Sequence, residues 1–110
     1  MSKTIGNFYL KLTDAGNLIG EFSNTEAEGS FPESAWRKCK IGAVPFVGDY
    51  ISTWYDKESG KSTAAELSIL PKYNDSAGLF KLVWSESGKQ TFHGQAMLCD
   101  GMLVGNYQSP

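Results

Sequence analysis

The chain has 110 residues, of which 41% are hydrophobic, and a formal net charge of −2 at pH 7. This length fits one domain over residues 1–110, large enough to bury a core without disulfides or metals. The slight negative charge argues against general nucleic-acid binding, which needs a basic excess. No run approaches the roughly 20 apolar residues of a membrane helix. We therefore expect neither nucleic acid nor a membrane among its partners.

The N-terminal residues Met-Ser-Lys-Thr-Ile-Gly contain no apolar signal core, so the sequence predicts a cytoplasmic protein. Its two cysteines, Cys39 and Cys99, are then expected to be free thiols. The strand pattern also places them on opposite faces of a sheet, with Cys39 facing inward, which argues against a disulfide.

Eight short segments alternate apolar and polar residues, as β-strands do, and no long stretch has clear helical periodicity. They cover residues 6–13, 18–23, 36–41, 48–55, 63–70 and 78–85, and a hairpin over 92–107 supplies the last two. The polar segment 24–34 is predicted to be the longest loop, with room for a short helical turn near residues 33–36. Residues 42–47, which contain Pro45, are predicted to form a corner.

The alternation is clearest between residues 92 and 107, where Asp100-Gly101 separates two runs. An Asp-Gly pair in this setting is a strong hairpin signal, because glycine tolerates the positive φ of a tight turn. Gly94 and Gly105 lie within the two runs. Glycines inside strands mark a bend or the close approach of another backbone, as small barrels require.

Short connections between eight strands favour an antiparallel meander. Closure into a barrel removes the edges that would otherwise pair with other chains. The predicted fold class is therefore all-β, an eight-stranded antiparallel up-and-down barrel, with a two-layer sandwich of the same strands as the alternative. Such a barrel is just wide enough to be filled by its own side chains or to hold one small ligand.

The same alternation predicts which side chains face the barrel interior, because their neighbours along the strands are charged. The predicted apolar interior consists of Phe8, Leu10, Leu12, Leu18, Phe22, Ile41, Leu67, Ile69, Phe80, Leu82, Phe92, Leu98 and Leu103. Apolar residues predicted to point outward are Ile19, Ile51, Leu79, Val83, Met97, Met102 and Val104. Because most of them belong to the C-terminal strands, and contiguous outer patches mark partner surfaces, we expect a homo-oligomer. Scattered surface residues are the alternative.

Two features resemble chemical motifs but lack their context. Residues 59–63, Ser-Gly-Lys-Ser-Thr, match the end of a phosphate-binding loop, yet the first glycine of that pattern is replaced by Tyr55. His93, the single histidine, faces outward without the further ligands that a metal needs. The carboxylates fall in turns and at strand ends, where no acid/base pair is formed. We expect no catalytic residue, no metal, no cofactor and no enzyme activity.

One constellation suits ligand binding, because tryptophan and tyrosine give flat apolar walls with a polar tip. Its members share the inward parity and are Tyr50, Ser52, Trp54, Trp84 and Tyr107. The alternative is that the four aromatic members plug the barrel as core. The sequence thus predicts a non-enzymatic barrel that binds a small apolar or aromatic ligand. A filled barrel that acts as an interaction or assembly module through its outer C-terminal strands is the alternative.

Residues 84–100, Trp-Ser-Glu-Ser-Gly-Lys-Gln-Thr-Phe-His-Gly-Gln-Ala-Met-Leu-Cys-Asp, resemble the Ser-Glu-Ser…Phe-Thr-Gly-Gln hairpin of avidin-type proteins. Residues 6–9 and 18–22 are similar to the first two strands of avidins and, more loosely, of lipocalins. The resemblance implies a calycin-like barrel that forms oligomers. Avidins place an Asn/Ser/Tyr set near these strands for biotin, whereas here Asn7 is followed by Phe8 and Tyr9. The resemblance therefore does not imply biotin binding.

Overall fold

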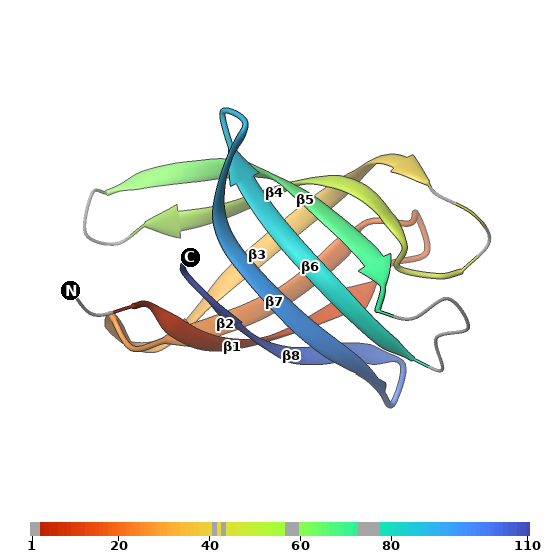
Figure 1. The fold of residues 1–110 in the computed structure, drawn as a ribbon, viewed down its shortest axis with the longest axis horizontal. Coiled ribbons are helices and arrows are strands. Elements are labelled where there is room, and N and C mark those ends of the chain that lie inside the picture. The colour runs from red at the N-terminus through yellow and green to blue at the C-terminus, as the bar shows by residue number, and fades with distance from the viewer. Residues whose placement is uncertain (1–2, 41, 43, 57–59, 73–77) are drawn as a thin grey trace.

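A computed structural model describes residues 3–40, 42, 44–56, 60–72 and 78–110, except for the side chain of Asp56. Its eight strands are β1 (Ile5–Leu12), β2 (Leu18–Asn24), β3 (Ala27–Lys40), β4 (Gly48–Asp56), β5 (Lys61–Pro71), β6 (Leu79–Glu86), β7 (Lys89–Cys99) and β8 (Met102–Gln108). Each strand pairs antiparallel with the next, and β1 pairs with β8 to close the barrel (Figure 1). The predicted up-and-down barrel is confirmed, and the sandwich alternative is wrong. Within the described residues, no helix is long and apolar enough to cross a membrane.

The largest difference from the sequence prediction is β3. Most of the segment predicted as a loop is strand, and residues 33–36 form no helical turn. Residues 28–30 are exposed, so this part of the strand lacks the apolar alternation that would have revealed it. Further along, Glu33 pairs with Gly20 of β2 and with Trp54 of β4, which places its side chain in the barrel.

Most of the predicted interior is confirmed. Eight of its members are fully or almost fully buried: Phe8, Leu10, Leu18, Leu67, Ile69, Phe80, Leu82 and Leu103. Leu12, Phe22 and Phe92 pack against this core while half-buried. Ile41 lies outside the described residues. Burying these apolar side chains is the main force that holds the barrel together.

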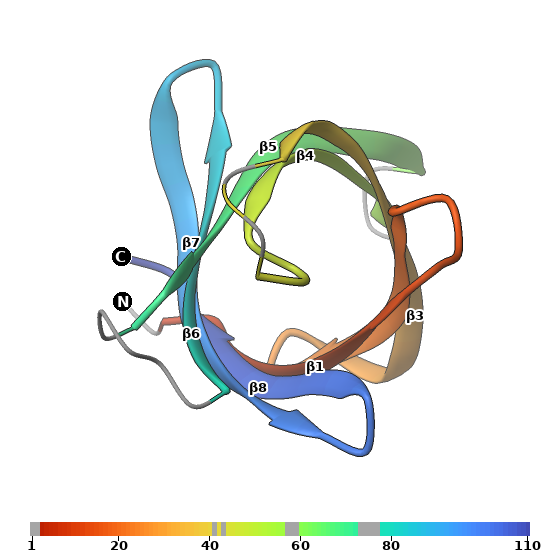
Figure 2. The same cartoon turned by 90° about the vertical axis from the view of Figure 1, so that its right-hand side faces the viewer.

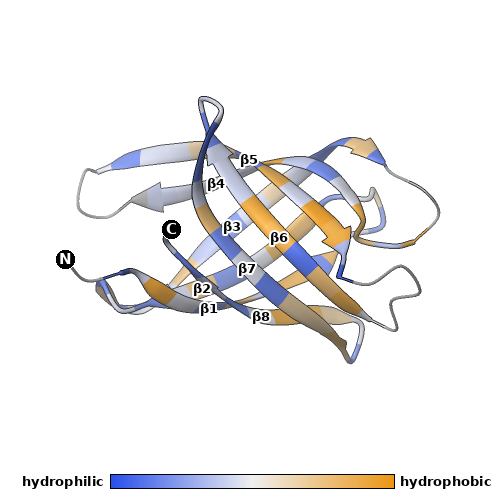
Figure 3. Cartoon of the chain, in the orientation of Figure 1, coloured by the Kyte–Doolittle hydropathy of each residue, from blue (hydrophilic) through white to orange (hydrophobic). Residues whose placement is uncertain are grey.

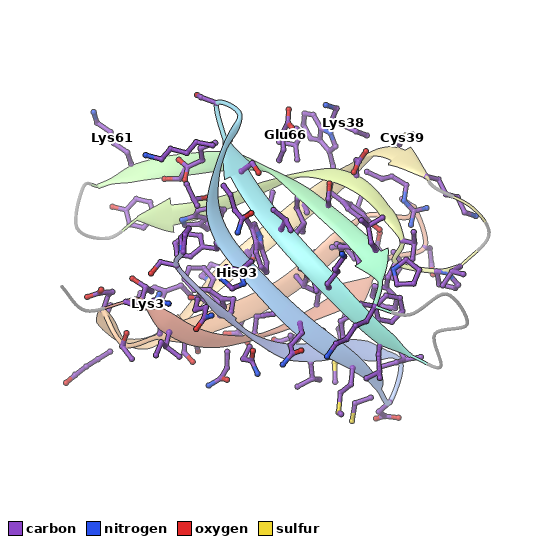
Figure 4. All side chains as sticks on the ribbon, in the orientation of Figure 1. Lys3, Lys38, Cys39, Lys61, Glu66 and His93 are labelled. Atoms are coloured by element: carbon purple, nitrogen blue, oxygen red, sulfur yellow. The ribbon has the colours of Figure 1, made fainter. Side chains whose placement is uncertain are left out.

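Two inward predictions are wrong. Leu98 is 49% exposed next to the β7–β8 hairpin, although its register partner Leu103 is fully buried. Cys39 is also exposed (Figure 4), because a β-bulge between Arg37 and Cys39 reverses the alternation of β3. Cys99 is exposed as well, and both cysteines are free thiols.

Residues 44–47, directly before β4, close one end of the barrel. Figure 2 shows them turned into the opening, and Phe46 and Val47 are buried. The Tyr50 hydroxyl donates a hydrogen bond to the Phe46 carbonyl at 2.8 Å, and Arg37 Nη2 donates to the Tyr50 hydroxyl at 3.1 Å. The described residues 44–47 of the predicted corner therefore plug this end of the core.

The glycines inside β7 and β8 allow the two backbones to approach closely. A Cβ on Gly105 would lie 2.0 Å from the carbonyl oxygen of Gln95, and one on Gly94 would lie 2.3 Å from that of Asn106. The predicted close approach at both glycines is confirmed, and no larger residue fits there without moving the strands.

Candidate functional site

A pocket opens at the end of the barrel opposite the Phe46 plug. Its volume is about 60 Å³, and its lining residues are Phe22, Asn24, Glu33, Trp54, Trp84, Phe92 and Tyr107. They come from six strands, β2, β3, β4, β6, β7 and β8. Glu33, Trp84 and Tyr107 are buried, whereas the other four residues are half-buried. The pocket therefore has a buried floor and a wall that reaches the surface.

Four aromatic rings form the wall as a closed circuit. Phe22 contacts Trp54, Trp54 contacts Phe92, Phe92 contacts Tyr107, and Tyr107 contacts Phe22, with ring centroids 5.5 to 6.5 Å apart. Successive rings are close to perpendicular, at 69° to 90°. We call these four rings the aromatic box. Edge-to-face pairs are favourable beyond their buried area, so the box is a packed and ordered wall.

Glu33 is the one carboxyl group of the floor, and only 5% of its surface is exposed. Its oxygen Oε2 accepts a hydrogen bond from Ser52 Oγ and another, at 3.0 Å, from Trp84 Nε1. Among the described residues, nothing donates to the second oxygen, Oε1. Burial raises the pKa of Glu33 above its ordinary value, and the two hydrogen bonds oppose this rise by stabilising the ionised form.

Tyr107 adds a phenol to the pocket. Asn24 Nδ2 donates a hydrogen bond to the Tyr107 hydroxyl at 3.0 Å. Burial raises the pKa of this phenol, the Asn24 bond lowers it, and the nearby charge of Glu33 raises it again. Tyr107 therefore stays protonated near neutral pH. Its ring also lies close to Gly6, where an added Cβ would come within 2.5 Å of the ring.

The structure brings together most of the predicted ligand-binding set. Trp54, Trp84 and Tyr107 line the pocket, and Ser52 is buried behind it as a donor to Glu33. Tyr50 does not reach the pocket, because it belongs to the plug at the other end of the barrel. Alternation along a strand fixes the face of a residue but not its height in the barrel. The sequence pattern therefore assigned residues from both ends of the barrel to one site.

Sequence reasoning missed Glu33 and Asn24 altogether, and it assigned Phe22 and Phe92 to the core only. Glu33 was placed in a loop, which hid its inward direction. The buried Ala35 lies two residues further on, and its parity is the signal that would have revealed Glu33.

Neither of the two remaining motifs, residues 59–63 and His93, gains the structural context that its chemistry would need. In the Ser-Gly-Lys-Ser-Thr motif, residue 59 is not among the described residues. From Lys61 the motif continues into strand β5, whereas a phosphate-binding loop would continue into a helix. The His93 Nε2 atom lies 3.5 Å from Gln108 Nε2 on the outer face of β7 and β8 (Figure 4). The described residues contain no group of three His, Cys, Asp or Glu side chains that could hold a metal ion.

The outer surface carries apolar side chains in register across three strands. Leu79 of β6 pairs with Met97 of β7, which pairs with Val104 of β8. These three residues line a shallow groove, and Met97 is 55% exposed. Figure 3 shows the alternation of polar and apolar residues along this side of the barrel.

Comparison with known proteins found no relative of this chain. No protein-family model matches the chain, and no match was found among curated proteins or among solved structures. The fold is that of an eight-stranded up-and-down barrel, and the resemblance to avidin-type hairpins stays a resemblance.

Proposed function

We propose that this protein is a non-enzymatic binding protein whose small ligand enters the aromatic box. The observation that carries the proposal is a carboxyl group buried at the floor of a pocket whose walls are aromatic and reach the surface. Ligand sites combine a mostly apolar lining with a few polar groups that fix orientation, and this pocket does so with Glu33, Tyr107 and Asn24.

The buried carboxyl group supports a binding role over a purely structural one. A buried acid costs folding free energy unless it is paired, and the described residues give Glu33 no cationic partner. An apolar side chain of similar size would avoid the cost of the buried charge, although it would leave the Ser52 and Trp84 donors without an acceptor. Perturbed acids in pockets are concentrated at functional sites, which favours a ligand as the reason for Glu33.

Tryptophan fluorescence tests the proposal, because the chain has three tryptophans in different settings. Trp54 and Trp84 line the pocket, and Trp36 is 61% exposed on the outer face of β3. A library of small aromatic and apolar compounds, with native mass spectrometry for any ligand retained on purification, should yield binders that change the emission. Trp54→Phe should remove most of this change, and Trp36→Phe should keep it.

The opposite result would count against the pocket. If no compound binds, and Trp54→Ala and Trp84→Ala each destabilise the fold like ordinary core truncations, by about 3–5 kcal/mol, the rings are only core.

A second candidate function, assembly through the outer face, rests on the groove formed by Leu79, Met97 and Val104. Exposed apolar residues in register across strands are typical of partner surfaces. Sedimentation should then show a homo-oligomer that Met97→Lys dissociates and Trp36→Lys, on another face, leaves intact. A monomer at all concentrations would contradict this candidate.

A further inference from the structure

The floor of the pocket carries the Glu33 carboxyl group, and its wall consists of aromatic rings. One class of ligand can interact favourably with both. We propose that the ligand is a small organic cation, an alkylammonium whose head group enters the aromatic box and pairs with the ionised Glu33 carboxylate. This inference rests on the proposed function, since it names the ligand class of the same pocket.

The aromatic box suits a cation. The face of an aromatic ring attracts a positive charge that lies within about 6 Å of its centroid. The four rings pack in a circuit with neighbouring centroids 5.5 to 6.5 Å apart, so a group between them lies near several rings. A neutral apolar ligand would also gain from these contacts. The rings alone therefore do not select the charge, and Glu33 decides it.

Glu33 has donors but no counter-charge. Ser52 and Trp84 both donate to Oε2, and these two hydrogen bonds stabilise the ionised form against the larger opposing effect of burial. Lys38 and Glu66 form the only ion pair among the described residues, on the outer surface (Figure 4). Arg37 is engaged with Tyr50 at the plugged end. A cation at Oε1 would supply the charge that the protein does not.

The size of the pocket narrows the class. A volume of about 60 Å³ compares with about 30 Å³ for one water molecule in the liquid. It accepts an ammonium group with one or two carbons, whereas the rest of the ligand must extend past the half-buried rings of Phe22, Trp54 and Phe92. A primary ammonium has donors for both Glu33 and the Tyr107 hydroxyl oxygen.

Binding should then depend on the ionisation of Glu33. The groups packed around it are Ser52 and Trp54 of β4, Trp84 of β6 and Tyr107 of β8, with Gly20 opposite on β2. Tyr107 is the one titratable group among them, and it stays neutral in the relevant range. Affinity for a cation should fall tenfold for each pH unit below the pKa of Glu33 in the free protein and level off above it.

Benzylammonium and benzyl alcohol provide the test, because they share a carbon skeleton and differ in charge. Their dissociation constants for the whole chain are measured by NMR titration between pH 4.5 and 8. We expect benzylammonium to bind at least tenfold more tightly at pH 8 and to lose this preference toward low pH. Glu33→Gln, which keeps the volume, should abolish the preference, whereas Glu66→Gln, which removes a charge from the outer surface, should retain it.

Each other outcome has a distinct meaning. Equal affinities, or tighter binding of the alcohol at every pH, would overturn the cation inference and leave the binding pocket in place. Absence of binding by both compounds up to their solubility would overturn the pocket itself. Circular dichroism of Glu33→Gln shows whether the variant is folded, and the pH profile of the unmodified chain tests the inference without it.

Discussion

Replacement of Glu33 by glutamine should change the way in which the stability of the barrel depends on pH. Burial raises the pKa of this carboxyl in the folded protein, whereas in the unfolded chain it keeps its ordinary value near 4.5. Between these two pKa values, the folded protein holds a proton that the unfolded chain has released. The free energy of unfolding must therefore decrease as the pH rises through this window.

The size of the effect follows from the linkage relation. One group that is fully protonated in the folded state and fully ionised in the unfolded state changes the free energy of unfolding by about 1.4 kcal/mol per pH unit. Stability from Glu33 is fully present below pH 4.5 and is lost as the pH rises through the folded pKa. Glutamine does not titrate, and its side-chain carbonyl can accept the same hydrogen bonds from Ser52 and Trp84.

Urea unfolding of both chains from pH 4 to pH 8 measures this difference directly. The stability of Glu33→Gln relative to the unmodified chain should increase with pH, at up to about 1.4 kcal/mol per unit, and then level off. All other titrating groups cancel in the comparison. Glu66→Gln, at an exposed carboxylate, should run parallel to the unmodified chain. Parallel curves for Glu33→Gln as well would refute the reasoning that burial raises the pKa of Glu33 in the folded protein.

Three further outcomes are expected. Leu67→Ala should lower the free energy of unfolding by about 2–5 kcal/mol, because Leu67 is fully buried; chemical denaturation measures it, and a loss below 1 kcal/mol would contradict the packed core. Ser52→Ala should lower the free energy of unfolding by about 1–3 kcal/mol. The decrease should be larger at pH 8 than at pH 4, because the lost hydrogen bond stabilises ionised Glu33. A decrease that does not depend on pH would contradict this role of the bond. Cys39 and Cys99 are exposed, so both should react with a thiol reagent in the folded protein as fast as in urea, and slow labelling would show that a partner covers them.

The sequence was most informative for strands that have one solvent-exposed face and one buried face. Trp54, Trp84 and Tyr107 were placed in the interior by alternation alone, because their strands follow that pattern throughout. The inward position of Glu33 was not predicted, because the alternation of β3 fails at both ends. The strand is exposed over residues 28–30, and it carries a bulge after Arg37. Tyr50 was grouped with Trp54, although four residues along a strand separate them by about 13 Å.

The seam between β1 and β8 has a consequence for the order of events in folding. It joins the two ends of the chain, and the hydrogen bond between Thr4 and Ser109 spans 105 positions. Contacts so distant in sequence form late, because the loop entropy must be lost before they contribute. Tyr107 reaches Asn24 and Phe22 only across this seam. We therefore expect the pocket to be completed late in folding, and a ligand that binds only the completed pocket would stabilise the closed barrel.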